Sequence, residues 1–276
     1  LEFRRVLFRS PGVYQGTWVK PAGDPIDNLV RPGELTADLQ RGSLDLLKQL
    51  NGLHQSQHAA DSELSARIES FELAWRMQSA APEALDLSSE TQQMQSLYGI
   101  GDEQCDHFAR QCLTARRLVE RGVRFVQIYS GGMENQRSWD GHNDIEGNHR
   151  QFAGETDKPV AALLTDMAAS GLLDETLVVM MGEMGRTPRI NKDAGRDHWS
   201  QCQTVILAGG GIRRGAVVGA SDETASYPTT QPYGIQDLLR TIFGLLGVDA
   251  DRIYQTPVGR PVQIVNGGHR IEELLA

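Results

Sequence analysis

The hydrophobic pattern of this 276-residue chain changes near residue 122, and this change constrains the fold more than any other feature. Before that point, apolar residues such as Leu44, Leu47 and Leu50 recur at helical spacing. After it, short continuous apolar runs alternate with helical segments. The run Thr176–Met181 has the length and unbroken hydrophobicity of a central parallel strand. We therefore predict an α/β fold with a mostly parallel sheet flanked by helices, and a helical region before it.

Glycine, proline and capping residues set the bounds of the predicted elements. Ser62 is a suitable N-cap for a second helix, which Pro82 is expected to break. Gly122 and Gly171 are expected to end two later helices. The predicted helices cover about 35–80, 102–121, 152–170 and 235–246, and the predicted strands are Arg124–Tyr129, Thr176–Met181 and Thr204–Ala208.

The first ten residues, LEFRRVLFRS, resemble the in-frame translation of a sequencing-library adapter, so we exclude residues 1–10 from the fold. The chain from Pro11 is then expected to be a fragment that lacks its N-terminal part. Residues 11–33, rich in Gly and Pro, predict an irregular entry segment. Residues 34–121 are expected to form the helical region, and residues 122–276 the α/β half.

Charge and composition exclude several classes of protein. The net charge is −9, and because residues 1–10 carry +2, the remainder carries −11. So acidic a chain is not expected to bind nucleic acid, which needs clustered cations. No apolar run approaches the roughly 20 residues of a membrane helix, so no membrane span is predicted. The three cysteines form no Cys-x-x-Cys pair and predict no disulfide framework.

Two segments that follow predicted strands carry side chains able to bind a metal ion, as expected at the edge of an open α/β sheet. Asp140 and His142 can converge on one cation if Gly141 lets the chain turn tightly. The alternative is a turn in which Asp140 accepts local backbone hydrogen bonds. Glu183 follows an apolar strand almost directly, where a carboxylate is costly unless it is paired or metal-bound. Arg186 is then either the ion-pair partner of Glu183 or a clamp for an oxyanion.

A third segment, GRDHW, places Arg196, Asp197 and His198 next to one another. This grouping suits a metal ion or an anion, and the alternative for His198 is a hydrogen-bonded core histidine. The glycine-rich run Gly209–Gly215 is interpreted as a strand followed by a hairpin turn. It is not interpreted as a nucleotide-binding loop, because the residues after it predict a strand where such a loop needs a helix.

Together these segments resemble a known family, and GEMGRTP followed by GRDHW is the most specific part of the resemblance. The chain after Pro11 resembles the bacterial family of domain of unknown function 1501 (DUF1501), sulfatase-like proteins of the alkaline phosphatase superfamily. The matching stretches are Trp139–His142, Asp157–Met167, Gly171–Pro188, Gly195–Trp199, Ala208–Glu223 and Asp237–Asp249.

The resemblance implies a parallel sheet with a metal site at the carboxyl ends of its strands. It implies hydrolysis of sulfate or phosphate esters, polysaccharide esters among them, with a divalent ion such as Zn, Ca, Mg or Mn. Met184 departs from the pattern, since a thioether is a poor ligand for a hard cation. Arg186 or Arg196 would offset charge on the transferred group. The implied metal ligands are Asp140, His142, Glu183, Asp197 and His198.

The resemblance also places the nucleophile and one aspartate ligand upstream of Pro11, so this fragment is expected to be inactive by itself. It implies twin-arginine export to the periplasm or beyond. Two other functions are considered. The departure at Met184 favours a non-catalytic, exported binding or scaffold protein that keeps the sulfatase-like fold. A nucleotide-binding oxidoreductase would rest only on Gly209–Gly215.

Overall fold

The computed structural model describes residues 16–20, 23–27, 29–57, 62–131, 138–256 and 258–276. The chain divides into two compact units, Leu1–Gln92 and Gln93–Ala276, and each is described by itself. The second unit includes helices that the sequence analysis assigned to a helical region ending at residue 121. Residues 1–10, which we excluded, lie outside the described residues.

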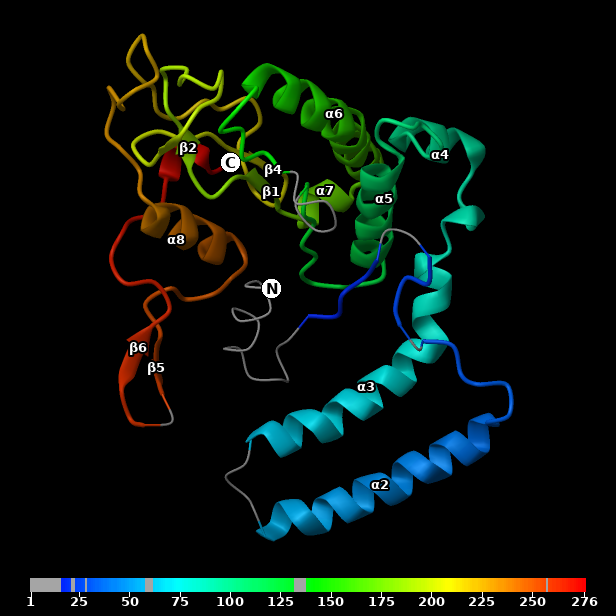
Figure 1. The fold of residues 1–276 in the computed structure, drawn as a ribbon. Helices are drawn as coiled ribbons and strands as arrows, with labels where there is room; N and C mark the ends of the chain where they lie inside the picture. Colours follow the sequence, from blue (N-terminus) through cyan, green and yellow to red (C-terminus); the bar gives the residue numbers. More distant parts are fainter. Residues whose placement is uncertain (1–15, 21–22, 28, 58–61, 132–137, 257) are drawn as a thin grey trace. The chain divides into compact units, whose positions relative to one another are not determined.

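The first unit is built on two helices, α2 (Ala37–Gln57) and α3 (Ser62–Leu85), which lie side by side (Figure 1). Arg41 joins them. Its Nη1 lies 3.1 Å from Glu72 Oε2, and its guanidinium lies 4.7 Å from the ring centroid of Trp75. Helix α3 runs through Pro82, so the predicted break there is wrong. The missing N–H of Pro82 removes one helical bond, while its carbonyl still accepts the N–H of Asp86 at 3.0 Å, so the helix continues past the proline to Leu85.

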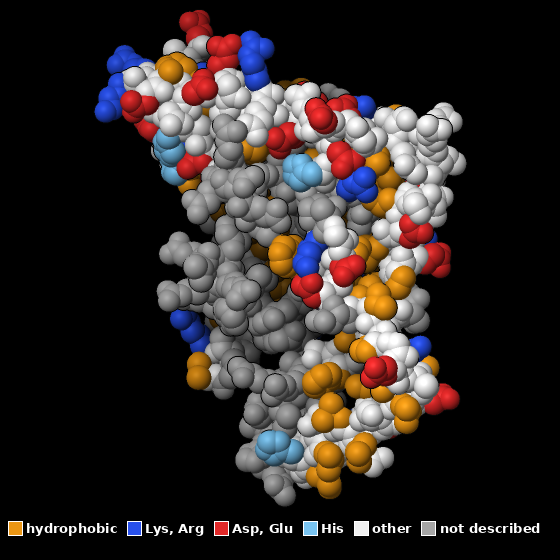
Figure 2. Space-filling model, turned by 45° about the vertical axis from the view of Figure 1, so that its right-hand side comes forward, with side chains coloured by type: hydrophobic (Ala, Val, Ile, Leu, Met, Phe, Trp, Pro, Cys, Tyr) orange, Lys and Arg blue, Asp and Glu red, His pale blue; other side chains and the backbone are white. Residues whose placement is uncertain are grey.

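Several apolar side chains of these two helices are exposed. Figure 2 shows hydrophobic side chains gathered over this helical pair. The pair therefore presents apolar surface alongside its charged side chains. The exposed apolar residues are Leu39, Leu46, Leu50, Leu53, Phe71 and Leu73.

The second unit has its core between two helices, α5 (Asp106–Glu120) and α6 (Ile145–Ser170). The Tyr98 hydroxyl, fully buried at the end of α4 (Gln92–Tyr98), donates to Asp166 at 2.9 Å. The helix α6 ends at Gly171, whose φ of 79° suits a glycine, as the sequence predicts. The core residues of the two long helices include Phe108, Cys112, Leu113, Phe152, Leu163 and Met167.

Three two-stranded sheets complete the second unit, and all three are antiparallel. In the first, β1 (Val178–Met181) pairs with β4 (Val205–Ala208), so that Met181 lies opposite Val205. In the second, β2 (Gly185–Arg186) pairs with β3 (His198–Trp199). The third pairs β5 (Ile253–Gln255) with β6 (Pro261–Gln263). The remaining elements of the second unit are α7 (Leu172–Glu175), α8 (Ile235–Leu245) and the short 3-10 helix η3 (Glu272–Leu274). Another short 3-10 helix, η2 (Leu87–Ser89), follows α3 in the first unit.

The prediction of a mostly parallel α/β sheet is therefore wrong for the described residues. Parallel neighbours need a long crossover, which is usually a helix. The connection from β1 to β4 holds no helix; it forms β2, β3 and their loops, and the chain returns antiparallel. A central parallel strand is also expected to be buried on both faces, whereas Met180 and Met181 are exposed.

Two further predicted strands are absent. Residues 124–129 form no strand, and Phe125 within them is exposed. Residues 216–219, expected as the second strand of a hairpin, also form no strand. Apolar content alone therefore did not make these stretches strands, because neither is paired into a sheet in the described part of the chain. Helix α8 and strand β4, by contrast, form within a residue or two of their predicted bounds.

None of the helices in the described part of the chain combines the length and the apolar character that a membrane crossing requires.

Candidate metal centre

Two loops far apart in sequence are joined by backbone hydrogen bonds. One precedes α6, and the other connects β2 to β3. The N–H of Asp144 donates to the carbonyl of Asp193 at 3.1 Å, and the N–H of Ile145 donates to that of Ala194 at 2.9 Å. The N–H of Arg196 donates to the carbonyl of Gly141 at 2.9 Å. These bonds hold residues 140–145 against residues 193–196.

The close approach of the two loops depends on Gly195, which is buried. A Cβ atom on this residue would lie 2.0 Å from both the carbonyl carbon and the carbonyl oxygen of His142. Backbone atoms cannot move aside as the end of a long side chain can. The site therefore requires glycine at position 195.

The first loop turns tightly before α6 begins. The N–H of His142 donates to the carbonyl of Asp140 at 2.9 Å, which closes a three-residue turn around Gly141. Asp144 then starts the helix: its φ is 41°, and its side chain accepts the N–H of Gly147. The turn brings the side chains of Asp140 and His142 together, as the sequence analysis expected if Gly141 allowed it.

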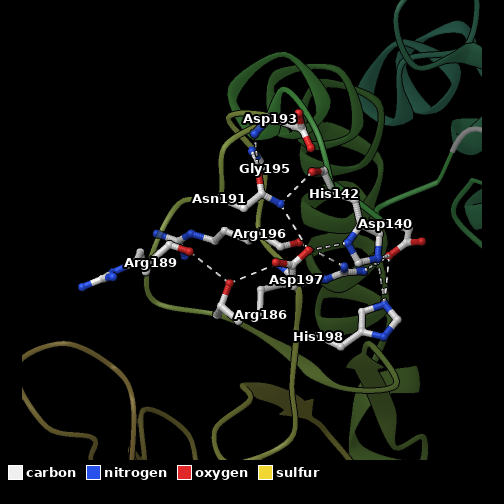
Figure 3. A network of polar contacts seen from close by, with 11 residues as sticks. Asp140, His142, Arg186, Arg189, Asn191, Asp193, Gly195, Arg196, Asp197 and His198 are labelled. Atoms are coloured by element: carbon white, nitrogen blue, oxygen red, sulfur yellow. Dashed lines mark hydrogen bonds and ion pairs between the residues drawn. The ribbon is translucent and has the colours of Figure 1, made fainter.

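Three potential metal ligands converge here: Asp140 and His142 from the loop before α6, and His198 from the start of β3 (Figure 3). Asp140 Oδ1 lies 3.1 Å from His142 Nε2 and 3.1 Å from His198 Nε2. The two Nε2 atoms are 3.2 Å apart. The three atoms thus form a nearly equilateral triangle. Each of the three side chains is close to half exposed, so His198 is not the core histidine that was its alternative.

Strand pairing places an arginine beside this triangle. In the β2–β3 ladder Arg186 lies directly opposite His198, so both side chains project from the same face. Arg186 Nη2 lies 2.6 Å from Asp140 Oδ1. Partial burial raises the pKa of Asp140, but hydrogen bonds from Arg186 and His198 outweigh it, and the pKa lies below its usual value.

Asp197 contacts the other side of the His142 ring. Its Oδ1 lies 2.9 Å from His142 Nδ1 and 3.2 Å from Asn191 Nδ2. The hydrogen bonds from His142 and Asn191 lower the pKa of the Asp197 carboxyl group. Asp197 is therefore not in the triangle of ligand atoms, although the sequence analysis counted it among the candidate ligands.

The other two predicted site residues are placed differently. Glu183 is exposed in the loop between β1 and β2, outside the group of converging ligands found in the described residues. Arg186 pairs with Asp140, so the alternative of a Glu183–Arg186 pair is not formed. The backbone carbonyl of Arg196 accepts a hydrogen bond from Arg186 Nη1 at 3.5 Å. The Nε of Arg196 is buried and has no hydrogen-bond partner in the described part of the chain.

Sequence reasoning missed Asn191. Its Nδ2 donates to the carbonyl of His142 at 2.9 Å, and its Oδ1 accepts the N–H groups of Asp193 and Gly195. Its only sequence signal is an Asn that opens the turn Asn191–Gly195, where an amide side chain commonly bonds to backbone groups. That signal predicts a turn, but not the bond to a histidine 49 residues earlier.

The comparisons with known proteins identify a family. The family model described as "Protein of unknown function (DUF1501)" matches residues 10–275. No curated protein matches the chain, and no solved structure does. Because the family match spans nearly the whole chain and includes every residue of the site, the chain belongs to the DUF1501 family, as its GEMGRTP and GRDHW segments suggested.

Proposed function

We propose that Asp140, His142 and His198 bind one divalent metal ion, and that this centre hydrolyses an ester of sulfate or phosphate. The triangle of ligand atoms carries the proposal. Two imidazoles and a carboxylate form a three-ligand set with an open side, although His198 lies 56 residues after His142 and 58 after Asp140. Catalytic zinc sites have such a set, with the fourth position left for water or substrate.

The spacing of the ligands fits a zinc-sized ion. Tetrahedral ligands about 2.05 Å from zinc are about 3.3 Å from one another. The observed separations are 3.1, 3.1 and 3.2 Å. Imidazole nitrogen suits zinc, whereas calcium and magnesium prefer six or more oxygen ligands. Of the four ions that the family resemblance implies, zinc therefore fits these residues best.

The ester substrate class rests on Arg186 and on the resemblance to sulfatase-like proteins. A bound divalent ion would supply Lewis-acid polarisation of an ester oxygen. Arg186 lies beside the ligands with its side chain largely shielded from solvent, 16% exposed. A planar, permanently charged fork in that position can bind two oxygens of a tetrahedral anion and offset the charge that develops on them.

The metal proposal is tested by the zinc content of purified variants. We expect about one zinc per chain in the wild-type protein after loading and dialysis, measured by inductively coupled plasma mass spectrometry. His198→Ala removes one of three ligands and is expected to retain none. His107→Ala, an exposed histidine on α5, is the matched control and should keep its zinc. Equal zinc in His198→Ala and the wild-type protein would refute the ligand assignment.

The hydrolase proposal is tested separately. 4-Nitrophenyl sulfate and 4-nitrophenyl phosphate would be incubated with the zinc-loaded protein, and release of 4-nitrophenol would be followed. In the described residues no nucleophilic side chain is hydrogen-bonded to the ligands, so this proposal assigns the attack on the ester to water, whereas the resemblance places the nucleophile upstream of Pro11. We expect release that stops when a chelator removes the zinc and that is absent in His198→Ala. A zinc-loaded protein that releases no product from either ester would contradict the hydrolase proposal and leave the metal site standing.

A non-catalytic, metal-dependent binding protein is the second candidate. In the part of the chain that the structure describes, no Ser, Thr or Cys side chain forms a hydrogen bond with the side chain of Asp140, His142 or His198. A nucleophile is thus not seen at these ligands. This function predicts zinc-dependent binding of inorganic sulfate or phosphate without turnover, which isothermal titration calorimetry can measure.

A further inference from the structure

The two ring nitrogens of His142 face different partners. Nε2 lies 3.1 Å from Asp140 Oδ1 and 3.2 Å from His198 Nε2, within the triangle of proposed ligands. Nδ1 points away from the triangle and lies 2.9 Å from Asp197 Oδ1 (Figure 3). Which nitrogen carries the proton therefore decides whether His142 can bind a metal ion through Nε2.

Both ring nitrogens lie near a carboxylate, but only Nδ1 is aligned for a hydrogen bond to its carboxylate, at Asp197 Oδ1; Nε2 lies 3.1 Å from Asp140 Oδ1 as an ion-pair contact without hydrogen-bond alignment. An ionised carboxylate can only accept a hydrogen bond, so Nδ1 must be the donor in the bond to Asp197. A neutral imidazole has one N–H group, which leaves a lone pair on Nε2. That lone pair is directed at the position where the other two ligand atoms converge.

Asp197 is itself held in place. Asn191 Nδ2 donates both to Asp197 Oδ1, at 3.2 Å, and to the carbonyl oxygen of His142, at 2.9 Å. The backbone N–H of Asp197 donates to Thr187 Oγ1 at 3.0 Å, and its carbonyl accepts the N–H of Thr187 at 2.8 Å. Asn191 Oδ1 also accepts two backbone N–H groups, so both the nitrogen and the oxygen of this side-chain amide form hydrogen bonds. Asp197 and His142 are thus fixed relative to each other.

We propose that Asp197, held by Asn191, is a positioning residue that keeps His142 in the Nδ1–H tautomer and aims its Nε2 lone pair at the metal ion. The inference rests on the proposed metal site and assigns Asp197 a role other than that of ligand. A carboxylate behind a ligating histidine fixes the ring and raises its basicity, and its loss typically weakens metal binding about 10- to 100-fold.

Three variants separate positioning from general loop structure. Asp197→Ala removes the acceptor and is expected to weaken zinc binding about 10- to 100-fold. Asp197→Asn keeps an oxygen that can accept the Nδ1–H and should recover most of the affinity. Asp193→Ala removes the same charge from the same loop, where the Asp193 side chain forms no hydrogen bond with His142, and should leave the affinity unchanged. Zinc affinity would be measured by competition with a chromogenic chelator.

The tautomer provides a measurement that a merely structural role would not change. In a long-range ¹H–¹⁵N spectrum of the chelator-treated protein near pH 8, wild-type His142 should show the Nδ1–H pattern. Asp197→Asn should show the same pattern, and Asp197→Ala should lose the preference. Circular dichroism would confirm that each variant is folded.

Either of two results would overturn the inference: an Nε2–H tautomer in the wild-type protein, or a folded Asp197→Ala variant that keeps both wild-type zinc affinity and the Nδ1–H tautomer. The wild-type spectrum alone decides the matter if Asp197→Ala does not fold. Failure of the proposed metal site gives a different pattern, because the wild-type protein would then bind no zinc while His142 still shows Nδ1–H.

Discussion

Arg186 Nη2 lies 2.6 Å from Asp140 Oδ1, the same oxygen that lies 3.1 Å from both imidazoles. A permanent positive charge and two proposed metal ligands therefore share one carboxylate oxygen. Strand pairing fixes this arrangement, since Arg186 and His198 face each other across β2 and β3. A bound anion that reached the metal ion would also be within reach of the guanidinium.

Replacing Arg186 should separate metal binding from catalysis. We expect Arg186→Gln to lower kcat/KM for 4-nitrophenyl esters by about 10²- to 10³-fold, because a preorganised donor to the transition state is lost. Zinc affinity should stay the same or increase, since a positive charge beside Asp140 is removed. Arg186→Lys should be intermediate, as it keeps the charge without the planar fork. Full activity in Arg186→Gln would show that Arg186 does not contact the transferred group.

Glu183 is expected to be dispensable for the metal ion. It is exposed and lies outside the group of converging ligands, although its position after an apolar strand made it a candidate. We therefore expect Glu183→Ala to keep one zinc per chain and Asp140→Ala to lose it, as measured by mass spectrometry of dialysed protein. A loss of zinc in Glu183→Ala would return Glu183 to the ligand set.

The parts of the site that sequence analysis found are local. Asp140 and His142 are two residues apart around a glycine, so their convergence depends only on a turn. His198 was a candidate because Arg196 and Asp197 stand next to it in the sequence, and not because its contact with Asp140 could be foreseen. Its meeting with Asp140 depends on backbone bonds between two loops, which no local pattern encodes.

The direction of the strands was not predictable from hydrophobicity. A short apolar run such as Thr176–Met181 fits a buried parallel strand and an antiparallel strand equally well, because hydrophobicity shows that a strand can be buried and not which way its neighbour runs. The outcome was decided by residues 182–204, which form short β-paired loops where a parallel connection needs a crossover. Asn191 was missed because its bonds form only in the folded loop: it bonds to the carbonyl of His142, which is distant in sequence, and to the N–H of Gly195 within its own turn.

Gly195 should be sensitive to the smallest substitution. Its added Cβ would meet the carbonyl group of His142 at 2.0 Å, so one loop must move. We expect Gly195→Ala to lower the free energy of unfolding by about 1–3 kcal/mol, as overpacked sites do, and to lower zinc affinity.

Gly182→Ala is the matched control, since its nearest neighbour, the carbonyl oxygen of Met184, would be 3.9 Å from the new Cβ. Urea unfolding followed by circular dichroism measures both variants. Equal stability of Gly195→Ala and the wild-type protein would show that the two loops are not in this close contact.

Asp237 should make the second unit sensitive to acid. Its carboxylate accepts the N–H of His269 at 2.7 Å and that of Gly234 at 2.6 Å, and these bonds lower its pKa in that order of importance. The unfolded chain, with an Asp pKa of about 3.9, therefore takes up this proton more readily than the folded protein. The stabilisation is fully present above the unfolded pKa and is lost as pH falls through the lower, folded value.

Asp237→Asn should accordingly be less stable than the wild-type protein at pH 7, and the difference should shrink as the pH falls below about 4. The urea midpoint of each protein at pH 7, 5 and 3 gives this difference directly. Asp157→Asn, on the exposed side of α6, serves as the control for removing one carboxylate from the same unit. A difference between Asp237→Asn and the wild-type protein that is the same at all three pH values would mean that ionisation of Asp237 does not contribute to stability, and that its side chain acts through hydrogen-bond geometry alone.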